Sequence, residues 1–281
     1  MIEFIKAFFF GIVEGITEWL PVSSTGHLIL FNEFVNLNVS KEFYSLFEVV
    51  IQLGAILAVV LIFWKEIWPL GLKEFKGAHA SNTTKKIYWK KDILNLWVKI
   101  IIACIPAMLT VPFNDKFEEK FYNFVPVSIA LIVFGVAFIL IENRNKTAKI
   151  LSVEEINYKT ALMIGLFQVL AAVFPGTSRS GATIIGALLI GVSRPAAASF
   201  TFYLAIPVMG GASLLKLLKF GLSFTSDELI ILLIGTVTAF VVSIFVIKFL
   251  MSYIKKHDFK IFGYYRIVLG ILLLLYYFII K

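Results

Sequence analysis

Two short stretches of a largely apolar chain collect the residue types that could handle an anion. EWLPVSSTGHLIL spans residues 18–30, and FPGTSRSGATII spans residues 174–185. In each stretch a proline is followed by small hydroxyl residues and a glycine, after which an apolar segment resumes. A helix that begins there presents free backbone N–H groups and the positive end of its dipole. Both stretches therefore predict anion-binding turns at helix starts.

The hydroxyls and glycines of these turns are the first candidates for ligand contacts. Hydroxyls can donate to an anion, and glycines let the backbone approach a ligand closely. The first turn offers Ser23, Ser24, Thr25 and Gly26, and the second offers Gly176, Thr177, Ser178, Ser180 and Gly181. The alternative for any one Ser or Thr in an apolar helix is a hydrogen bond to its own preceding turn. Two matched clusters favour ligand binding over that alternative.

Charged residues accompany both turns. Arg179 offers a planar fork of donors that matches phosphate oxygens, although it could instead be the structural partner of a glutamate. Glu14 and Glu18 lie four residues apart and so share one helix face. Two buried carboxylates need a cation, a proton or Arg179, and Mg²⁺ typically binds one or two carboxylates together with substrate phosphates. The set predicts a phosphate or diphosphate site with a metal on Glu14 and Glu18.

Reactive groups complete the first turn. His27 follows the hydroxyls by three residues and could act as a general base or acid near neutral pH. Ser24 is a candidate nucleophile, with water as the other candidate. The alternative for His27 is an interhelical hydrogen-bond donor.

The elements that must position these residues are membrane helices. The chain has 281 residues, of which 59% are hydrophobic and only 16% charged, and its mean hydropathy is +0.91. A soluble domain averages about 45–50% apolar and about 25% charged residues. The net charge of +8 fits lysines in loops beside an anionic leaflet better than nucleic-acid binding, because no basic stretch is interleaved with aromatic residues.

Six apolar runs are long enough to cross a bilayer as helices. They lie at about 45–64, 97–113, 124–141, 197–218, 229–250 and 262–280. Two shorter apolar pairs, 2–30 and 161–193, are each interrupted by a Pro/Ser/Gly cluster. The predicted fold is an all-α integral membrane protein with six full transmembrane helices and two broken, re-entrant helix pairs.

Loop charge and internal similarity suggest the topology. Basic loops at 65–96, 142–160 and 251–261 alternate with poorly charged ones, which places them in the cytoplasm and both termini outside. A shift of 154 residues superposes the two broken pairs, as with Gly11 on Gly165, Glu14 on Gln168, Pro21 on Pro175, Ser23 on Thr177 and Ser24 on Ser178. The prediction is one transmembrane domain, 1–281, whose halves (about 1–141 and 142–281) form an inverted repeat with both turns meeting near the midplane.

The remaining polar residues have weaker interpretations. The single cysteine, Cys104, excludes an intramolecular disulfide and a cysteine-rich zinc site, and we expect it to pack in the core. Glu48 and Gln52 share a helix face and could either pack or reach the site. Arg266 could either snorkel to the cytoplasmic interface or join the site. Solvated loop positions are expected for His79, His257, Asp115, Glu118 and Glu119.

These motifs resemble those of a known family. GIVEGITEWLPVSSTGH (11–27) and PGTSRSGAT (175–183) are similar to the two signature motifs of bacterial undecaprenyl-diphosphatases, the bacitracin-resistance family. FEVVIQLGAILAVVLIFW (47–64) resembles that family as well, and the likeness extends over the whole chain.

The resemblance implies a membrane hydrolase that converts undecaprenyl diphosphate to undecaprenyl phosphate and inorganic phosphate, which recycles the lipid carrier of cell-wall synthesis. It implies Mg²⁺ or Ca²⁺ as cofactor, a site opening outward and a bacterial plasma (inner) membrane location. The family's functional residues map here onto Glu14, Glu18, Ser24, His27, Ser178, Arg179, Ser180 and Thr183. We expect the protein to lie in membrane lipid and to bind no nucleic acid. A homodimer is possible.

Two other functions compete with a diphosphatase. A transporter or flippase of a phosphorylated lipid would use the same architecture, but transport does not need Ser24 and His27 as reactive groups. A phosphatidic-acid-type phosphatase would need a second catalytic histidine, and the sequence has none between His79 and His257.

Overall fold

The computed structural model describes residues 1–76, 83–144, 147–221 and 223–279. Its six long apolar helices fall on the six predicted runs, and each is long and apolar enough to cross a membrane. They are α3 (Lys41–Ile62), α5 (Lys91–Met108), α7 (Phe124–Asn143), α10 (Arg194–Phe220), α11 (Ser226–Tyr253) and α12 (Lys260–Ile279). The protein is therefore a multi-pass membrane protein, as the hydropathy pattern predicts.

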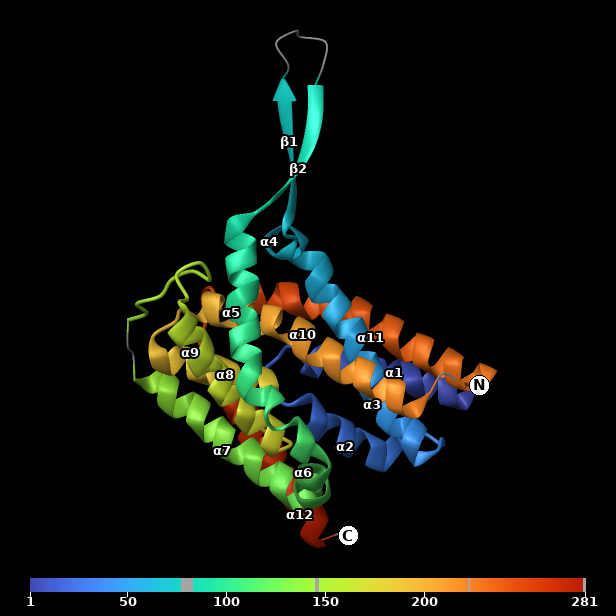
Figure 1. The fold of residues 1–281 in the computed structure, drawn as a ribbon. Coiled ribbons are helices and arrows are strands. Elements are labelled where there is room, and N and C mark those ends of the chain that lie inside the picture. The colour runs from blue at the N-terminus through green and yellow to red at the C-terminus, as the bar shows by residue number, and fades with distance from the viewer. Residues whose placement is uncertain (77–82, 145–146, 222, 280–281) are drawn as a thin grey trace.

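Four shorter helices form the two interrupted pairs (Figure 1). They are α1 (Ile2–Thr17) with α2 (Ser24–Val35), and α8 (Tyr158–Val173) with α9 (Arg179–Ile190). Each pair turns back on itself. At the open end of the first pair, Lys6 Nζ donates to the Asn36 carbonyl at 2.8 Å. At the open end of the second, the Lys149 amide donates to the Gly191 carbonyl at 2.8 Å.

The long helices enclose these two pairs. Helix α7 packs along α12, α11 packs along both α1 and α3, and α5 packs along α8. Close approaches at glycines make this possible, since a Cβ on Gly11 would lie 2.5 Å from the Gly235 carbonyl oxygen of α11. A Cβ on Gly165 would lie 2.3 Å from the Ala103 carbonyl oxygen of α5. The equivalent glycines of α1 and α8 thus seat the two broken pairs against different long helices.

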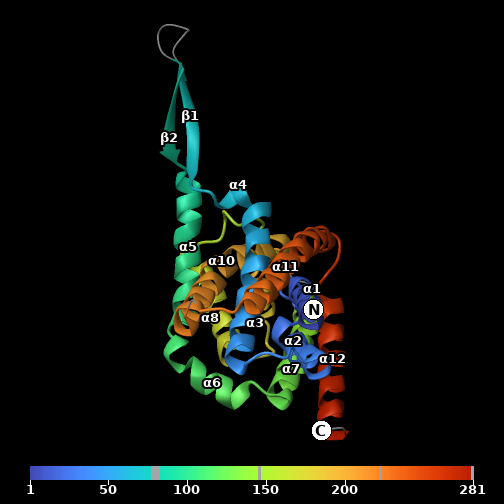
Figure 2. The same ribbon diagram turned by 90° about the vertical axis from the view of Figure 1, so that its right-hand side faces the viewer.

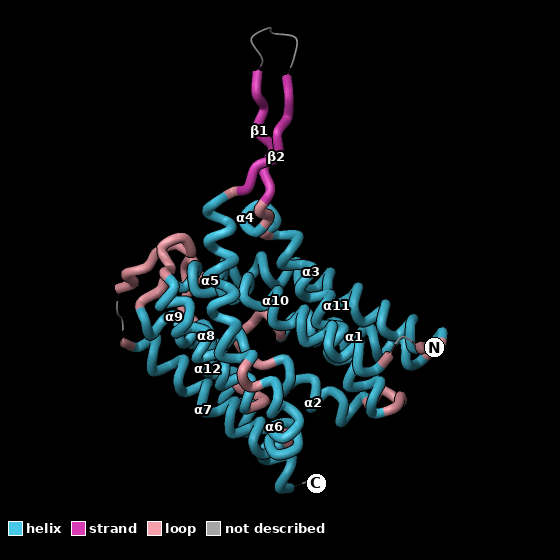
Figure 3. The backbone as a smooth tube through the Cα atoms, viewed as in Figure 1, coloured by secondary structure: helices cyan, strands magenta, loops and turns pink. Residues whose placement is uncertain are grey.

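One part of the chain departs from the all-α prediction. The connection between α3 and α5 holds a short helix, α4 (Trp64–Ile67), and an antiparallel hairpin of β1 (Leu70–Lys76) and β2 (Thr83–Trp89). The hairpin projects from the helical body (Figures 2 and 3). The β-branched and aromatic residues of β2, namely Thr83, Thr84, Ile87, Tyr88 and Trp89, favour a strand in this lysine-rich segment.

The three basic connections gather at one end of the bundle. Lys99 Nζ, midway along α5, donates to the Glu154 carbonyl at 2.9 Å. Glu142, at the end of α7, accepts from Arg194 Nε at 2.9 Å and from the Phe259 amide at 3.0 Å. The other end carries η1 (Val111–Phe113) and α6 (Asn114–Phe121). The grouping agrees with the charge pattern of the loops.

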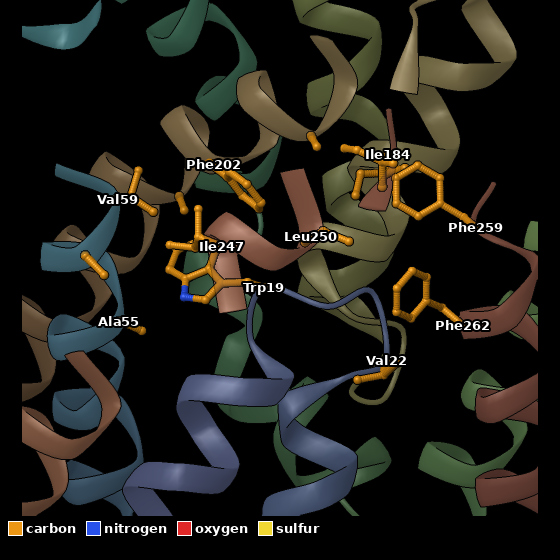
Figure 4. Close-up of a cluster of buried hydrophobic side chains, with 14 of the residues drawn as sticks. Trp19, Val22, Ala55, Val59, Ile184, Phe202, Ile247, Leu250, Phe259 and Phe262 are labelled. Atoms are coloured by element: carbon orange, nitrogen blue, oxygen red, sulfur yellow. The ribbon is translucent and has the colours of Figure 1, made fainter. Parts of the chain in front are cut away.

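The first turn is anchored in the hydrophobic core by Trp19. This side chain is fully buried and meets Phe202 of α10 edge to face, with ring centroids 5.2 Å apart. Figure 4 shows it reaching from the turn into the space between Ala55 and Val59 of α3 and Ile247 of α11. Burying a large ring beside the turn holds the turn's polar residues at a fixed depth.

Candidate active site

Two serine caps define the site. Ser23 Oγ accepts from the Gly26 amide at 3.3 Å, and Ser178 Oγ accepts from the Gly181 amide at 3.1 Å, so each serine caps the helix that follows it. Both caps have left-handed backbone angles, with φ of 75° at Ser23 and 69° at Ser178. A non-glycine residue in this region costs about 1–3 kcal/mol, and such strain gathers at functional sites.

The caps correct the predicted alignment of the two turns. They match Ser23 with Ser178 and Gly26 with Gly181, which is a shift of 155 residues rather than 154. The shift of 154 relates Glu14 to Gln168, and the spacing from that position to the cap is one residue longer in the second pair, although the break before α9 (174–178) is itself one residue shorter than the break before α2 (18–23). Helix α2 begins at Ser24 and α9 at Arg179, so Ser24, Thr25 and Ser180 lie inside the first helical turn, whereas the sequence had predicted them before it.

The tips of the two pairs touch. Ser180 Oγ donates to the Glu18 carbonyl at 3.2 Å, and Arg179 Nη2 lies 3.1 Å from Glu18 Oε1. The first helical turn of α9 thus lies against the break between α1 and α2. Their caps satisfy only some of the first four N–H groups of each helix, which leaves the remaining first-turn amides for a ligand.

Arg266 binds the tips together and is fully buried. Its guanidinium donates to the carbonyls of Pro21 at 3.2 Å, Gly176 at 2.9 Å and Thr177 at 2.8 Å. A weaker bond of 3.4 Å reaches the Leu131 carbonyl in α7. The snorkelling interpretation of Arg266 is therefore wrong. Its donors are used on the protein backbone, so it fixes the two turns against each other.

Glu18 occupies the centre of a short hydrogen-bonded chain. One carboxylate oxygen lies against Arg179, and the other accepts from Ser24 Oγ at 2.7 Å. Arg179 Nη1 is held in turn by the Thr201 carbonyl at 3.0 Å, while its Nε has no partner among the described residues. A serine hydroxyl that donates to a carboxylate has the geometry of a nucleophile beside its base.

The structure does not join His27 to Ser24. Its Nδ1 lies 2.7 Å from the Ser23 carbonyl, and its Nε2 lies 2.7 Å from the Tyr265 hydroxyl, with the two rings parallel and 5.6 Å apart. Because a carbonyl can only accept, the proton of a neutral ring sits on Nδ1, and Nε2 accepts from Tyr265. The Ser24 hydroxyl donates to Glu18 rather than to His27, and a proton-transfer role for His27 stays a prediction.

Glu14 is the best candidate for a cation ligand. It is fully buried, and neither carboxylate oxygen has a hydrogen-bond partner among the described residues. Glu18, Glu48 and Arg179 all lie within electrostatic range of it. The Glu18 amide donates to the Glu14 carbonyl at 3.0 Å, so the helical path continues and the two carboxylates share a face, as predicted. A buried carboxylate with free oxygens fits a cation or a proton.

The two carboxylates do not make a complete metal site by themselves. Within the described part of the chain, no group of three or more His, Cys, Asp or Glu side chains is placed to hold a metal ion. Mg²⁺ completes its coordination with water and substrate phosphate when the protein offers one or two carboxylates. The donor set therefore fits a metal that arrives with a phosphorylated substrate.

Two predicted ligand residues have structural partners instead. The Thr183 hydroxyl bonds to the Arg179 carbonyl at 2.9 Å and to the Thr201 hydroxyl at 2.9 Å, which joins α9 to α10. A Cβ on Gly176, at φ +91°, would lie 2.6 Å from the Val127 carbonyl oxygen, so this glycine permits contact with α7. Thr177 is different, because its hydroxyl is buried and has no partner among the described residues.

The other predictions have mixed outcomes. Glu48 accepts from the Tyr122 hydroxyl at 3.1 Å, and Gln52 is half-buried. Cys104 is buried, as predicted, and His257 and Glu119 are exposed. His79 lies outside the described residues, as do the side chains of Asp115 and Glu118.

Two further residues at the site escaped the sequence analysis as functional candidates. Gln168 is buried, and neither polar atom of its side chain has a partner in the described structure. The alignment of Gln168 with Glu14 at a shift of 154 residues could have marked Gln168 as a candidate. Nothing in the sequence could have marked Tyr265, because its partner His27 lies 238 residues away.

Comparison with known proteins agrees with the site's composition. A family model described as "Bacitracin resistance protein BacA" matches residues 7–272. A protein of Clostridium acetobutylicum named undecaprenyl-diphosphatase 1 is 60% identical over 282 residues, covering 99% of each chain. Proteins named undecaprenyl-diphosphatase from Acetivibrio thermocellus and Enterococcus faecalis are 58% and 60% identical, covering 100% and 98% of this chain and 100% and 97% of their own.

Proposed function

The chain belongs to the bacitracin resistance protein BacA family, and from that premise we propose how it acts as an undecaprenyl-diphosphatase. The enzyme hydrolyses undecaprenyl diphosphate to undecaprenyl phosphate and inorganic phosphate, in keeping with its full-length relatives of that name. The reaction recycles the lipid carrier of cell-wall synthesis, and the family name links it to bacitracin resistance.

The observation that carries the mechanism is the chain Ser24–Glu18–Arg179 at the meeting point of two helix starts. The backbone amides in the first helical turn of α2 and of α9, together with Arg179, bind the diphosphate. They also stabilise the charge on the transferring phosphoryl group, which is the main task in phosphoryl transfer. The pairing of Arg179 with Glu18 positions both groups before substrate binds.

Ser24 is the nucleophile in this proposal. Its Oγ forms a bond to the terminal phosphorus while the bond from that phosphorus to the bridging oxygen breaks. The Ser24 proton passes to Glu18, and undecaprenyl phosphate leaves. Water then attacks the phosphoserine, which releases inorganic phosphate and restores the hydroxyl. His27, held by Ser23 and Tyr265, keeps the first turn in shape and carries a neutral ring beside the site.

Glu14 and Glu18 are the residues we assign to Mg²⁺ or Ca²⁺. The unpartnered oxygens of Glu14 support this assignment. A bound divalent cation supplies charge neutralisation for the phosphate oxygens. Gln168 and Thr177, with buried polar atoms that lack partners in the described structure, are placed to complete the polar lining.

The two closed helix pairs suggest the path of the substrate. We place them as re-entrant elements that enter the bilayer from opposite sides, as an inverted repeat would. In that arrangement the basic connections lie in the cytoplasm and both termini lie outside. The site then opens outward from the bacterial plasma membrane, and apolar surfaces between the helices receive the prenyl tail.

A lipid-phosphate flippase is the second candidate function, because helix pairs that meet tip to tip also suit alternating access. The hydrogen bond from Ser24 to Glu18 favours the hydrolase, since transport requires no activated hydroxyl.

The test is phosphate release from undecaprenyl diphosphate by purified protein in detergent, with Mg²⁺ and with EDTA. Ser24→Ala and Glu18→Gln should each lower kcat by about 10²–10⁴-fold, the usual contribution of such groups. Ser213→Ala is the matched control, since Ser213 is buried and its hydroxyl donates, within the described residues, to the Val49 carbonyl alone, at 2.9 Å. Acid quench should trap phosphate on Ser24.

The outcomes separate the candidate mechanisms. If Ser24→Ala retained most of its activity and no phosphoserine formed, water would be the nucleophile. No phosphate release by folded wild-type protein under any metal would favour the flippase.

A further inference from the structure

A second polar cavity lies away from the active site, at the end of the bundle that carries the basic connections. Its volume is about 260 Å³. It forms where the C-terminal ends of α7, α9 and α11 meet the start of α10. Glu142, Arg144, Arg194 and Lys255 line it together with apolar residues such as Leu188 and Ile254. None of these residues takes part in the hydrolytic site described above.

The charges of this cavity do not cancel. Glu142 and Arg194 form a two-pronged ion pair, and Glu142 also accepts the Phe259 amide, so this carboxylate is already satisfied. Arg144 and Lys255 are exposed, and neither forms an ion pair within the described part of the chain. The neighbouring Asp258 is paired with Lys260 at 3.1 Å. Two uncompensated cations therefore remain at the cavity.

The lining also has an ordered donor. Arg194 uses Nε and Nη2 on Glu142, which orients its guanidinium, and its Nη1 has no hydrogen-bond partner within the described residues. The Glu142 pair thus holds an arginine in place without using all of its donors. An ion-paired arginine beside two exposed cations is an arrangement that suits phosphate oxygens.

The depth of the cavity points to a lipid. Helices α7 and α11 end beside it and α10 begins there, and all three are long enough to span a membrane. The cavity therefore lies near the headgroup level, and its apolar residues face the start of the hydrocarbon. Basic pockets between helices on the cytoplasmic side bind anionic lipid headgroups. Its volume is below the ~300–1,000 Å³ of pockets for drug-sized ligands, which suits a headgroup rather than a whole lipid.

We infer that this cavity binds the phosphate group of an anionic membrane lipid through Arg144, Arg194 and Lys255. The site is separate from the one that hydrolyses undecaprenyl diphosphate. It anchors the ends of three long helices to the leaflet that surrounds them.

Lipid titration followed by native mass spectrometry tests this inference. Full-length protein is titrated with phosphatidylglycerol and, in parallel, with zwitterionic phosphatidylcholine. The test variant is Arg144→Gln with Lys255→Gln, which leaves the Glu142–Arg194 pair intact. The matched control is Lys91→Gln with Lys256→Gln, which removes two exposed cations from the same end of the protein but outside the cavity lining.

Phosphatidylglycerol should bind wild type and control equally, and binding to the test variant should weaken by about 5-fold per cation, or about 25-fold in all. Phosphatidylcholine should bind all three weakly. If the test variant and the control bound phosphatidylglycerol with equal affinity, the proposal that this cavity binds the lipid phosphate would be refuted. Displacement of phosphatidylglycerol by millimolar inorganic phosphate would instead assign the cavity to free phosphate and overturn the lipid assignment. Phosphate release from undecaprenyl diphosphate, measured on the same samples, reports separately on the hydrolytic site.

Discussion

Replacing Arg266 by methionine would remove the group that holds the two turns together while keeping a long, apolar side chain. The native guanidinium binds four backbone carbonyls, those of Pro21, Leu131, Gly176 and Thr177. It also lies 5.8 Å from the centre of the Phe134 ring. Three of these carbonyls belong to the helix breaks, so the substitution acts on the active site without touching a proposed reactive group.

The expected loss follows from the count of acceptors. Each buried carbonyl left without its donor costs about 1–3 kcal/mol, which gives about 4–12 kcal/mol for four. Removing a buried charge recovers part of its desolvation cost. We therefore expect about 4 kcal/mol of destabilisation, near the low end. At about 2–4 °C per kcal/mol for chains of similar size, the Tm should fall by about 8–16 °C. Arg266→Lys should lower the Tm less than Arg266→Met does, because the ammonium keeps three of the hydrogen-bond donors.

Thermal unfolding in detergent, followed by the fluorescence of the five tryptophans, measures this effect. Phosphate release at a temperature below both transitions then shows whether the turns still meet. Lys256→Met is the control, because it removes an exposed cation at the end of α11. An Arg266→Met protein with a Tm within about 2 °C of wild type and normal activity would refute the clamp.

Three further predictions follow from the contacts at and around the site. His27→Phe should lower kcat by about tenfold or less. In a double-mutant cycle of initial rates, adding Tyr265→Phe should lower kcat little further, because the two side chains form one hydrogen-bonded unit. A loss near 10⁴-fold for His27→Phe would instead assign His27 the role of general base. Glu14→Gln should raise the Mg²⁺ concentration for half-maximal activity at least tenfold, as measured by Mg²⁺ titration, and an unchanged midpoint would remove Glu14 from the metal site. Glu142→Gln should destabilise the protein by about 1–3 kcal/mol in thermal unfolding, since it leaves the partly exposed Arg194 without its carboxylate.

The sequence predicted the helices well because apolar run length is a direct consequence of membrane thickness. All six long runs became helices, and both interruptions became turns between shorter helices. The hairpin after α4 was missed, because the search for spans treated the polar segment 65–96 only as a loop. The β-branched and aromatic residues at 83–89 were the available signal.

The sequence predicted which residues belong to the candidate site better than it predicted which of them hydrogen-bond to each other. Glu14, Glu18, Ser24 and Arg179 do meet, because motif and helical spacing constrain them. Partner choice depends on side-chain direction across distant helices, which spacing along one helix cannot give. Spacing alone could not show, for example, that the Ser24 hydroxyl donates to Glu18 and not to the neighbouring His27.

Arg266 shows the same limit most clearly. An arginine five residues inside a span predicts snorkelling when only its own helix is considered. The carbonyls that bind it come from residues 89 to 245 positions away in the sequence. Three of these carbonyls lie in the breaks between helices, where proline and glycine interrupt the helical hydrogen bonds. The sequence around Arg266 gives no sign of them.

The register of the two serine caps has a consequence for how the enzyme could have arisen. With Ser23 matched to Ser178, the first helical residues also correspond, and these are Ser24 in one turn and Arg179 in the other. Two identical subunits facing each other would present two serines or two arginines at this place, never one of each. Under the inverted repeat proposed above, joining both copies in one polypeptide lets them diverge, so that one supplies the proposed attacking serine and the other the proposed charge-binding arginine.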